Sequence, residues 1–306
     1  MTPKASAIAS RKRPSGSGDV IDQLRRKYDD LTHSQKRIAQ FIVENPQAVA
    51  FSTIDQMAIE LGVNASTIVR FTYRLGLQGF PDLQRRIRDL VKRQLHRATE
   101  PSEDTLGAPQ LAGTSFGASL HHDLQNLQRT LLRANAADFD RAVEQIVLAR
   151  RVYVTAGFSS FAVAHYFALI LNRLRADIVL FHADDAFSAI QIDEMDAKDC
   201  VVAFTFPRYA TATQRLAQWA KNKGAAVIAV TDTPISAVGQ LATTVLLADS
   251  GGTGIQNSLV CPMAVANALL NGVAGAKGAE ALERHARQDR ILHDWHALLL
   301  MDEEDE

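Results

Sequence analysis

The sequence predicts two domains of different fold class: an all-α domain, followed by an α/β domain built on a doubly wound, parallel, five-stranded sheet. The 306 residues, of which 47% are hydrophobic and 22% charged, are enough for two globular cores. Residues 19–97 contain only helical patterns. After residue 117, short β-branched runs alternate with helical patterns, which is typical of a parallel sheet covered on both faces.

The domain boundaries follow changes in composition. Residues 1–18 are rich in Ser, Gly, Pro, Lys and Arg, which predicts a disordered basic tail before the all-α domain of residues 19–97. Residues 98–116, "ATEPSEDTLGAPQLAGTSF", lose periodicity and gain Pro, Gly and acidic residues, so we expect a linker there. Residues 117–300 form the predicted α/β domain, and residues 301–306 an acidic tail.

The net charge of −1 is divided unevenly between the two parts of the chain. Residues 1–97 hold 17 Lys and Arg against 9 Asp and Glu, a net charge of +8, and the remainder holds 16 against 25, a net charge of −9. A basic module favours a polyanionic partner, because neutralising phosphates releases condensed counterions. The alternative is a basic face that is simply solvated.

Five helical patterns are expected in the first domain, with polar residues that cap helices before three of them. The patterns cover 20–28, 34–44, 53–61, 65–75 and 81–95. The expected caps are Thr32 or Ser34, Ser52 or Thr53, and Asn64.

Five apolar runs are the expected strands of the second domain: "RVYVTA", "DIVLFH", "CVVAFTF", "AAVIAV" and "TTVLLA". A helical stretch over 117–150 precedes them. The helical patterns between them are "SSFAVAHYFALILNRL", "DAFSAIQID", "ATATQRLAQWAKNKG" and "SAVGQLA", and two further helices are predicted over 256–275 and 279–300.

The region that begins at Ile54 fits a twenty-residue helix-turn-helix frame. Two steeply crossing helices need a small residue at their closest approach, which is Ala58, and a residue that adopts positive φ in the turn, which is Gly62. The apolar contacts of the frame fall on Met57, Leu61, Val63, Ile68 and Phe71. An ordinary helical hairpin is the alternative interpretation.

The second helix of this frame starts near Asn64, and its unburied face is the surface that enters the major groove in this motif. That face presents Ala65, Ser66, Thr67, Arg70, Tyr73 and Arg74. The planar fork of Arg70 can bond O6 and N7 of a guanine together. Thr67 suits a thymine methyl group or a phosphate. Contact with backbone phosphates is expected of Lys36, Arg37, Arg85, Arg86 and Arg88, although each could equally be solvated surface.

The stretch "LTHSQKRIAQFIVENPQAVAFSTIDQMAIELGVNASTIVRFTYRLGLQGFPDLQRRI" resembles the N-terminal domain of the RpiR/MurR family of bacterial transcriptional regulators. The "LG…GF" after the predicted recognition helix belongs to this resemblance. In that family the second domain is a SIS (sugar isomerase) domain, and the strand and helix alternation agrees with it. The resemblance implies a DNA-binding regulator whose SIS-like domain binds an effector.

Two loops at the carboxyl ends of predicted strands carry the hydroxyl groups and the arginine of the predicted effector site. The sequence "AGFSSF" contributes Ser159 and Ser160, and "TFPRYATAT" contributes Thr205, Arg208, Tyr209, Thr211 and Thr213. In doubly wound sheets, ligands bind at this edge, where helix N-termini attract anions. The loops therefore predict a site for a phosphate or another small anion. Helix capping is the alternative role for Ser159 and Thr211.

SIS domains carry a Gly-x-Gly-x-Ser pattern in the first of these loops. This sequence has the second glycine as Gly157 and the serine as Ser159, with Thr155 in place of the first glycine. The second loop lacks the glycine of the family pattern and has "FPRY" instead. The resemblance implies a phosphosugar or a related carbon-pathway intermediate, while Arg208 suits a carboxylate as readily as a phosphate.

An aldose–ketose phosphate isomerase with an appended basic domain is the main alternative. Such an enzyme needs a positioned general base, and Glu194, His165 and His182 are poorly placed candidates. His293 and His296 could share a metal ion but lack a third ligand. We therefore predict no catalytic residues, no metal and no cofactor. A protein that compacts nucleic acid without a ligand is a second alternative.

The complete prediction is a cytoplasmic regulator that binds a palindromic operator in double-stranded DNA as a homodimer or tetramer. No apolar run approaches the roughly 20 residues that span a bilayer, so no membrane partner is predicted. Cys200 and Cys261 are expected to be buried thiols. The 117–150 stretch and the long C-terminal helix are the candidate subunit interfaces.

Overall fold

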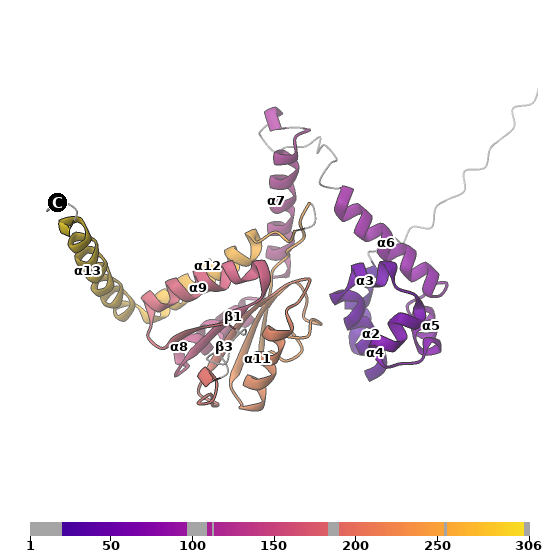
Figure 1. Ribbon diagram of the computed structural model, residues 1–306, viewed down its shortest axis with the longest axis horizontal. Coiled ribbons are helices and arrows are strands. Elements are labelled where there is room, and N and C mark those ends of the chain that lie inside the picture. The colour runs from indigo at the N-terminus through magenta and orange to yellow at the C-terminus, as the bar shows by residue number, and fades with distance from the viewer. Residues whose placement is uncertain (1–19, 97–108, 112, 183–189, 254–255, 303–306) are drawn as a thin grey trace, which may run out of the picture.

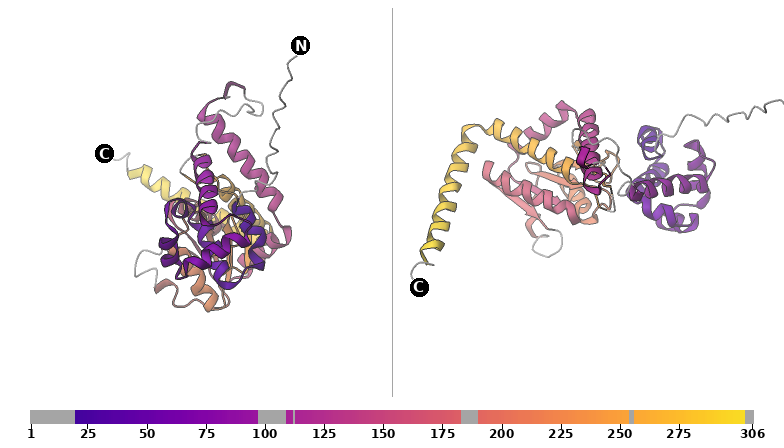
Figure 2. Two further views of the ribbon diagram at one scale, coloured as in Figure 1. Left: turned by 90° about the vertical axis from the view of Figure 1, so that its right-hand side faces the viewer. Right: turned by 90° about the horizontal axis from the view of Figure 1, so that it is seen from above.

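A computed structural model describes residues 20–96, 109–111, 113–182, 190–253 and 256–302 of the chain. It contains a helical domain and an α/β domain (Figure 1), and the view from above shows the two domains side by side along the long axis (Figure 2, right). The tails at 1–18 and 303–306, and most of the predicted linker, lie outside the described residues.

The helical domain consists of six α-helices around one apolar core. They are α1 (Val20–Lys27), α2 (His33–Glu44), α3 (Pro46–Phe51), α4 (Ile54–Leu61), α5 (Ala65–Arg74) and α6 (Phe80–His96), with a 3-10 turn at Tyr28–Asp30. Leu24, Ile38 and Phe71 are fully buried in this core. The short helix α3 was not predicted; Pro46 opens it at the first helical position, where a missing N–H costs no hydrogen bond.

Helices α4 and α5 form the predicted helix-turn-helix geometry. At the start of α4 the Thr53 hydroxyl accepts from the Gln56 backbone N–H at 3.2 Å, and the Gln56 side chain accepts from the Thr53 N–H at 2.8 Å. This reciprocal capping box satisfies two N–H groups of the first turn. The helix ends at Gly62, which has φ 60° and ψ 39°. Only glycine adopts this left-handed conformation without a steric cost, so the predicted role of Gly62 is confirmed.

The α/β domain contains a five-stranded, all-parallel sheet in the order β2-β1-β3-β4-β5. The strands are β1 (Val152–Ala156), β2 (Ile178–Phe181), β3 (Cys200–Thr205), β4 (Ala226–Thr231) and β5 (Thr244–Leu247). In register, Val154 of β1 pairs with Leu180 of β2 and with Val202 of β3. The predicted fold class is confirmed in both domains.

Helices cover both faces of the sheet. The helices α8 (Ala136–Leu148), α9 (Phe161–Leu174) and α12 (Val260–Lys277) cover one face, and α11 (Thr211–Asn222) covers the other. Alternate strand residues separate the two cores, since Val154 packs toward the first face and Tyr153 toward the second. Helix α7 (Ser115–Arg133) packs on α12, and the long helix α13 (Ala279–Asp302) extends away from the domain (Figures 1 and 2).

Two helical predictions were wrong in detail. The stretch predicted as continuous over 117–150 is two helices. Helix α7 ends at Arg133, and Asn135 caps α8 by accepting from the Ala137 backbone N–H at 2.9 Å. Residues 236–242 form a series of turns instead of a helix. There the Ser236 hydroxyl accepts from the Gly239 backbone N–H at 3.1 Å and folds the chain back on itself. The predicted helix "DAFSAIQID" lies largely outside the described residues.

No helix in the part of the chain that the structure describes combines the length and apolar character needed to cross a membrane.

Candidate DNA-binding helix and effector pocket

Helix α5 buries one face and exposes the other. Ile68 and Phe71 pack into the core of the helical domain. The opposite face contains the exposed Ser66, Arg70, Tyr73 and Arg74, with Asn64 at the N-cap and Thr67 half-buried. Helix α5 itself lies on the side of the helical domain away from the sheet (Figure 1).

Arg70 is placed in the middle of the exposed face. Its Nε lies 3.4 Å from the carbonyl oxygen of Ser66, one turn earlier in the same helix. This long contact leaves the guanidinium able to turn toward a base edge. Helical spacing puts Ser66, Arg70 and Arg74 one above another, which is the row that a major groove would accept.

Other predicted DNA contacts also hold the helical domain together. Arg37 donates from Nη2 to the Leu61 carbonyl at 2.6 Å, across the end of α4. Arg74 donates to the Asp30 carbonyl at 2.5 Å, and the Lys36 ammonium lies 5.3 Å from the centre of the Tyr28 ring. These bonds fix the position of positive charge around the motif, and the contacts of these residues with DNA stay a prediction.

Three arginines of α6 make contacts within the domain. Arg85 and Arg86 both bond the buried Asp82, at 2.5 and 3.2 Å. The backbone N–H of Gln78 lowers the pKa of Asp82 most, and Arg86 lowers it further against the effect of burial. Arg88 donates to the Ala50 carbonyl at 2.7 Å and so ties α6 to α3. These contacts give the three arginines a structural role, whether or not they also contact phosphate.

A small pocket lies at the carboxyl edge of the sheet, between the loop after β1 and the loop after β3. Strands β2 and β3 lie on opposite sides of β1, so the two loops diverge here, at the position where doubly wound sheets bind ligands. The pocket brings together five of the predicted effector residues, Ser159, Ser160, Thr205, Arg208 and Thr213. It is also lined by Gly157, Phe158, Phe204, Phe206, Pro207, Ala210 and Asn257.

The lining of the pocket favours an anion. Helices α9 and α11 both start beside it, and helix N-termini present free N–H groups and the positive end of the helix dipole. Arg208 adds a positive charge, and none of the described lining residues is acidic.

Two hydroxyl groups of the lining are buried without a hydrogen-bond partner among the described residues. They belong to Thr205, which is 3% exposed, and to Thr213, which is 1% exposed. A buried hydroxyl with no partner costs about 1–3 kcal/mol, so such groups are uncommon away from sites that bind something polar. Both hydroxyls could bond a ligand held between the loops.

In this conformation the two loops press against each other. The cavity volume is about 20 Å³, room for a single water molecule. A Cβ atom added at Gly157 would lie 2.1 Å from the Cβ of Ala210, so this position requires glycine for the contact. Each loop also holds a non-glycine residue at positive φ, Phe158 at 52° and Arg208 at 72°. Such backbone strain is concentrated at functional sites.

Two of the predicted effector residues lie outside the pocket lining. Tyr209 points away from it, and its hydroxyl donates to Asp232 Oδ1 at 2.7 Å. Burial, followed by the charge of Asp232, raises the pKa of Tyr209. Thr211 is the first residue of α11. Asn257 lines the pocket and was not predicted; its amide donates to the Pro207 carbonyl at 2.9 Å, a contact between loops that no local sequence pattern reveals.

The candidate acid–base residues are not in the described lining of the pocket. Glu194 lies 3.6 Å from Arg151, which precedes β1 and therefore sits at the opposite edge of the sheet. His165 lines a separate groove beside α13, and His182 follows β2 against the Phe161 ring. Among the described residues, no cluster of three or more His, Cys, Asp or Glu side chains could hold a metal ion.

Fold and site together define a class of protein, a helix-turn-helix domain joined to a SIS domain. The model of the rpiR-family helix-turn-helix domain matches residues 18–94, and that of the SIS domain matches residues 145–272. The chain belongs to the RpiR family of transcriptional regulators.

Relatives and solved structures agree with this assignment. The HTH-type transcriptional regulator HexR of Escherichia coli is 24% identical over 290 residues, which cover 90% of this chain and 95% of HexR. The sugar isomerase domain of an RpiR transcription factor from Sphaerobacter thermophilus is 28% identical, with a TM-score of 0.54, over 56% of this chain and 96% of that domain. NanR of Vibrio vulnificus, solved with ManNAc-6P, shares the fold at 18% identity with a TM-score of 0.56, over 90% and 98% of the two chains.

Proposed function

We propose that this protein binds a palindromic DNA operator through helix α5 and changes its DNA binding when a small anionic metabolite occupies the pocket between the β1 and β3 loops. The observation that supports this most directly is the exposed, basic face of α5 in a helix-turn-helix frame, on the same chain as a pocket suited to an anion. In this proposal Arg70 reads a base edge, and Ser66, Thr67 and Arg74 complete the contact surface.

The effector class is a phosphosugar or a related carbon-pathway intermediate. Two helix N-termini, two buried hydroxyl groups and Arg208 suit a phosphate group. NanR, which shares this fold, was solved with the phosphosugar ManNAc-6P. A carboxylate would make the same bonds, so the ligand class has to be separated by experiment.

The protein acts as a homodimer or tetramer in this proposal, since two helix-turn-helix domains are needed to contact both halves of a palindrome. Helix α13 supports this with the exposed apolar side chains of Ile291, Leu292 and Trp295, which are 59%, 49% and 65% exposed. Beside them lies an apolar groove of about 420 Å³ between α9, β2 and α13. A second copy of the chain would cover both the exposed side chains and the groove.

Because the proposed target is DNA, the proposal locates the protein in the cytoplasm.

The DNA-binding part of the proposal is tested by selecting genomic fragments with the purified protein at about physiological salt, where weak non-specific binding is suppressed. Enrichment of a palindromic site is the expected result. Recovery of fragments without any common sequence would contradict it and would favour general compaction of nucleic acid.

The effector part is tested by adding ManNAc-6P, other phosphosugars, their unphosphorylated sugars and simple carboxylates, while measuring the thermal unfolding of the protein. We expect a phosphosugar to raise the unfolding temperature of the wild type but not of Arg208→Ala, because a ligand that binds only the folded state stabilises it. A shift by carboxylates alone would reassign the effector class. Following each phosphosugar by NMR separates sensing, which leaves it unchanged, from isomerisation.

A further inference from the structure

The two domains touch through the loop at 232–240, which follows β4. Ile235, at the tip of this loop, is 5% exposed and belongs to the apolar core of the helical domain. Around it, the Ala237 backbone N–H donates to Glu44 at 2.7 Å, and the Gln240 side chain donates to Gln40 at 3.1 Å. The helical domain is therefore docked on the loop by helix α2 and by the surface around Ile235.

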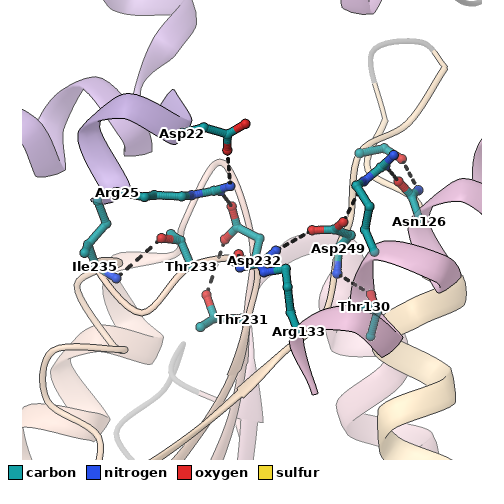
Figure 3. A network of polar contacts seen from close by, with 12 residues as sticks. Asp22, Arg25, Asn126, Thr130, Arg133, Thr231, Asp232, Thr233, Ile235 and Asp249 are labelled. Carbon is teal, nitrogen blue, oxygen red and sulfur yellow. Dashed lines mark hydrogen bonds and ion pairs between the residues drawn. The ribbon is translucent and has the colours of Figure 1, made fainter. Parts of the chain in front are cut away.

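Asp232 joins this docking surface to the effector pocket. One carboxylate oxygen accepts from Arg25 of α1 at 3.3 Å (Figure 3). The other accepts from the Tyr209 hydroxyl at 2.7 Å. Arg133 of α7 donates to the backbone carbonyl of Asp232 at 2.7 Å and holds the main chain in place. The Asp232 side chain is thus the shared partner of a helical-domain residue and of a pocket-loop residue.

Tyr209 belongs to the β3 loop, so it moves if that loop shifts when the pocket opens. It lies between Arg208 and Ala210, which both line the pocket, while its own side chain faces Asp232. The cavity of about 20 Å³ cannot accept a sugar phosphate unless the β1 and β3 loops separate. The contact between Gly157 and Ala210 is the one that must part, and Ala210 is the next residue after Tyr209.

We infer that the contacts from Tyr209 through Asp232 to Arg25 couple the effector pocket to the docked position of the helical domain. This inference rests on the proposed function of the pocket. A ligand that separates the loops withdraws the Tyr209 hydroxyl from Asp232. The carboxylate then loses a charge-assisted bond beside Arg25, docking weakens, and the helical domain gains freedom of movement.

A substitution that forces the β1 and β3 loops apart without a ligand tests the coupling. Gly157→Ala adds a methyl group 2.1 Å from the Ala210 Cβ, at an ordinary φ of −117°, so the strain falls on the loop contact rather than on the backbone. The matched control is Gly157→Ala with Ala210→Gly. In that protein the 2.1 Å contact is gone, and the next nearest atoms, the Cα of residue 210 at 3.6 Å and Thr213 Oγ1 at 3.8 Å, are at normal contact distances.

Hydrogen exchange of the full chain reports docking through residues 232–240 and helix α1. We expect Gly157→Ala to speed exchange there about tenfold, the effect of losing one hydrogen bond to a charged group. The double variant should return to the wild-type exchange rates, and Arg25→Ala should speed exchange as much as Gly157→Ala does. Strand β3 serves as the internal reference for an intact sheet.

Faster exchange confined to 157–160 and 207–213 in Gly157→Ala would overturn the inference. If that variant fails to fold, Tyr209→Phe makes the same test, because it removes only the hydroxyl that bonds Asp232; wild-type exchange at 232–240 would then refute the coupling. These results are independent of the effector. If the protein binds a phosphosugar but Gly157→Ala leaves exchange at 232–240 unchanged, the coupling alone is refuted. If Gly157→Ala speeds that exchange but no phosphosugar binds, only the proposed ligand is refuted.

Discussion

At the residue scale, the buried hydroxyl of Thr213 supports the proposed ligand pocket. Its hydroxyl is buried without a partner among the described residues, whereas the hydroxyl of Thr244, in the same domain and 2% exposed, donates to Gln145 at 3.0 Å. A polar atom that is buried without a bond lowers stability, so this hydroxyl beside the pocket supports the proposal that a polar ligand binds there.

Replacing the hydroxyl of Thr213 with a methyl group therefore carries no penalty in the protein without ligand. We expect Thr213→Val to leave the free energy of unfolding unchanged or raise it by up to about 1 kcal/mol, and Thr244→Val to lower it by about 1 kcal/mol. Urea unfolding of the α/β domain measures both. A clear loss of stability in Thr213→Val would mean that its hydroxyl already has a structural partner.

The two cysteines give a prediction about thiol reactivity at pH 8. Burial raises the pKa of Cys200 to about 12 and also raises the pKa of Cys261. The thiolate is the reactive form, and a raised pKa keeps both groups as thiols at pH 8. We expect a thiol-reactive disulfide reagent at that pH to modify neither cysteine in the folded protein and both after denaturation. Fast reaction of the native protein would contradict the buried positions.

At the scale of elements, local patterns were enough where local forces decide the structure. The capping box at Thr53, the left-handed Gly62 and the alternation of apolar strands with helices each follow from neighbours in the sequence. The turns at 236–242 could not be predicted this way. Beside the local bond from Gly239 to Ser236, the neighbouring Ile235 packs into the core of the helical domain, a contact that no local pattern reveals.

Substitutions at Gly62 test the turn between α4 and α5. A side chain at φ 60° is strained even though the nearest atom to an added Cβ, Arg37 Nη2, is 3.9 Å away. We expect Gly62→Ala to lower the free energy of unfolding of the helical domain by roughly 1–2 kcal/mol, and Gly62→Asn to lower it less, because Asn tolerates the left-handed region. Equal losses in urea unfolding would show that the cost is not backbone strain.

At the scale of the whole molecule, sequence reasoning located most of the candidate site but not the connection between domains. Five of the seven predicted effector residues line one pocket, since parallel strands bring their carboxyl ends to one edge. Asp232 went unnoticed as a link because its partners, Arg25 and Tyr209, come from elements far apart in the chain. Such contacts carry no periodic signal.

The exposed apolar side chains of α13 give a whole-molecule prediction. We expect sedimentation to find the wild type as a dimer or tetramer, and Trp295→Glu to shift it toward monomer, since burying a carboxylate in an apolar interface is costly. His293→Glu is the control, because it adds the same charge on the same helix at a side chain that is 83% exposed. Identical behaviour of the two variants would remove the apolar face of α13 from the interface.

In the proposed function, α5 reads DNA sequence through Arg70. The most direct measurement is the ratio of the affinities for a selected palindromic duplex and for an unrelated duplex of the same length, at one salt concentration. Wild type is compared with Arg70→Ala and with Arg26→Ala, which removes the same charge from an exposed position on α1.

We expect Arg70→Ala to lower this ratio about tenfold or more, in line with about 1–3 kcal/mol for a bidentate base contact. Arg26→Ala should leave the ratio unchanged, even if its charge loss weakens binding to both duplexes. An unchanged ratio in Arg70→Ala would contradict the claim that this side chain specifies sequence.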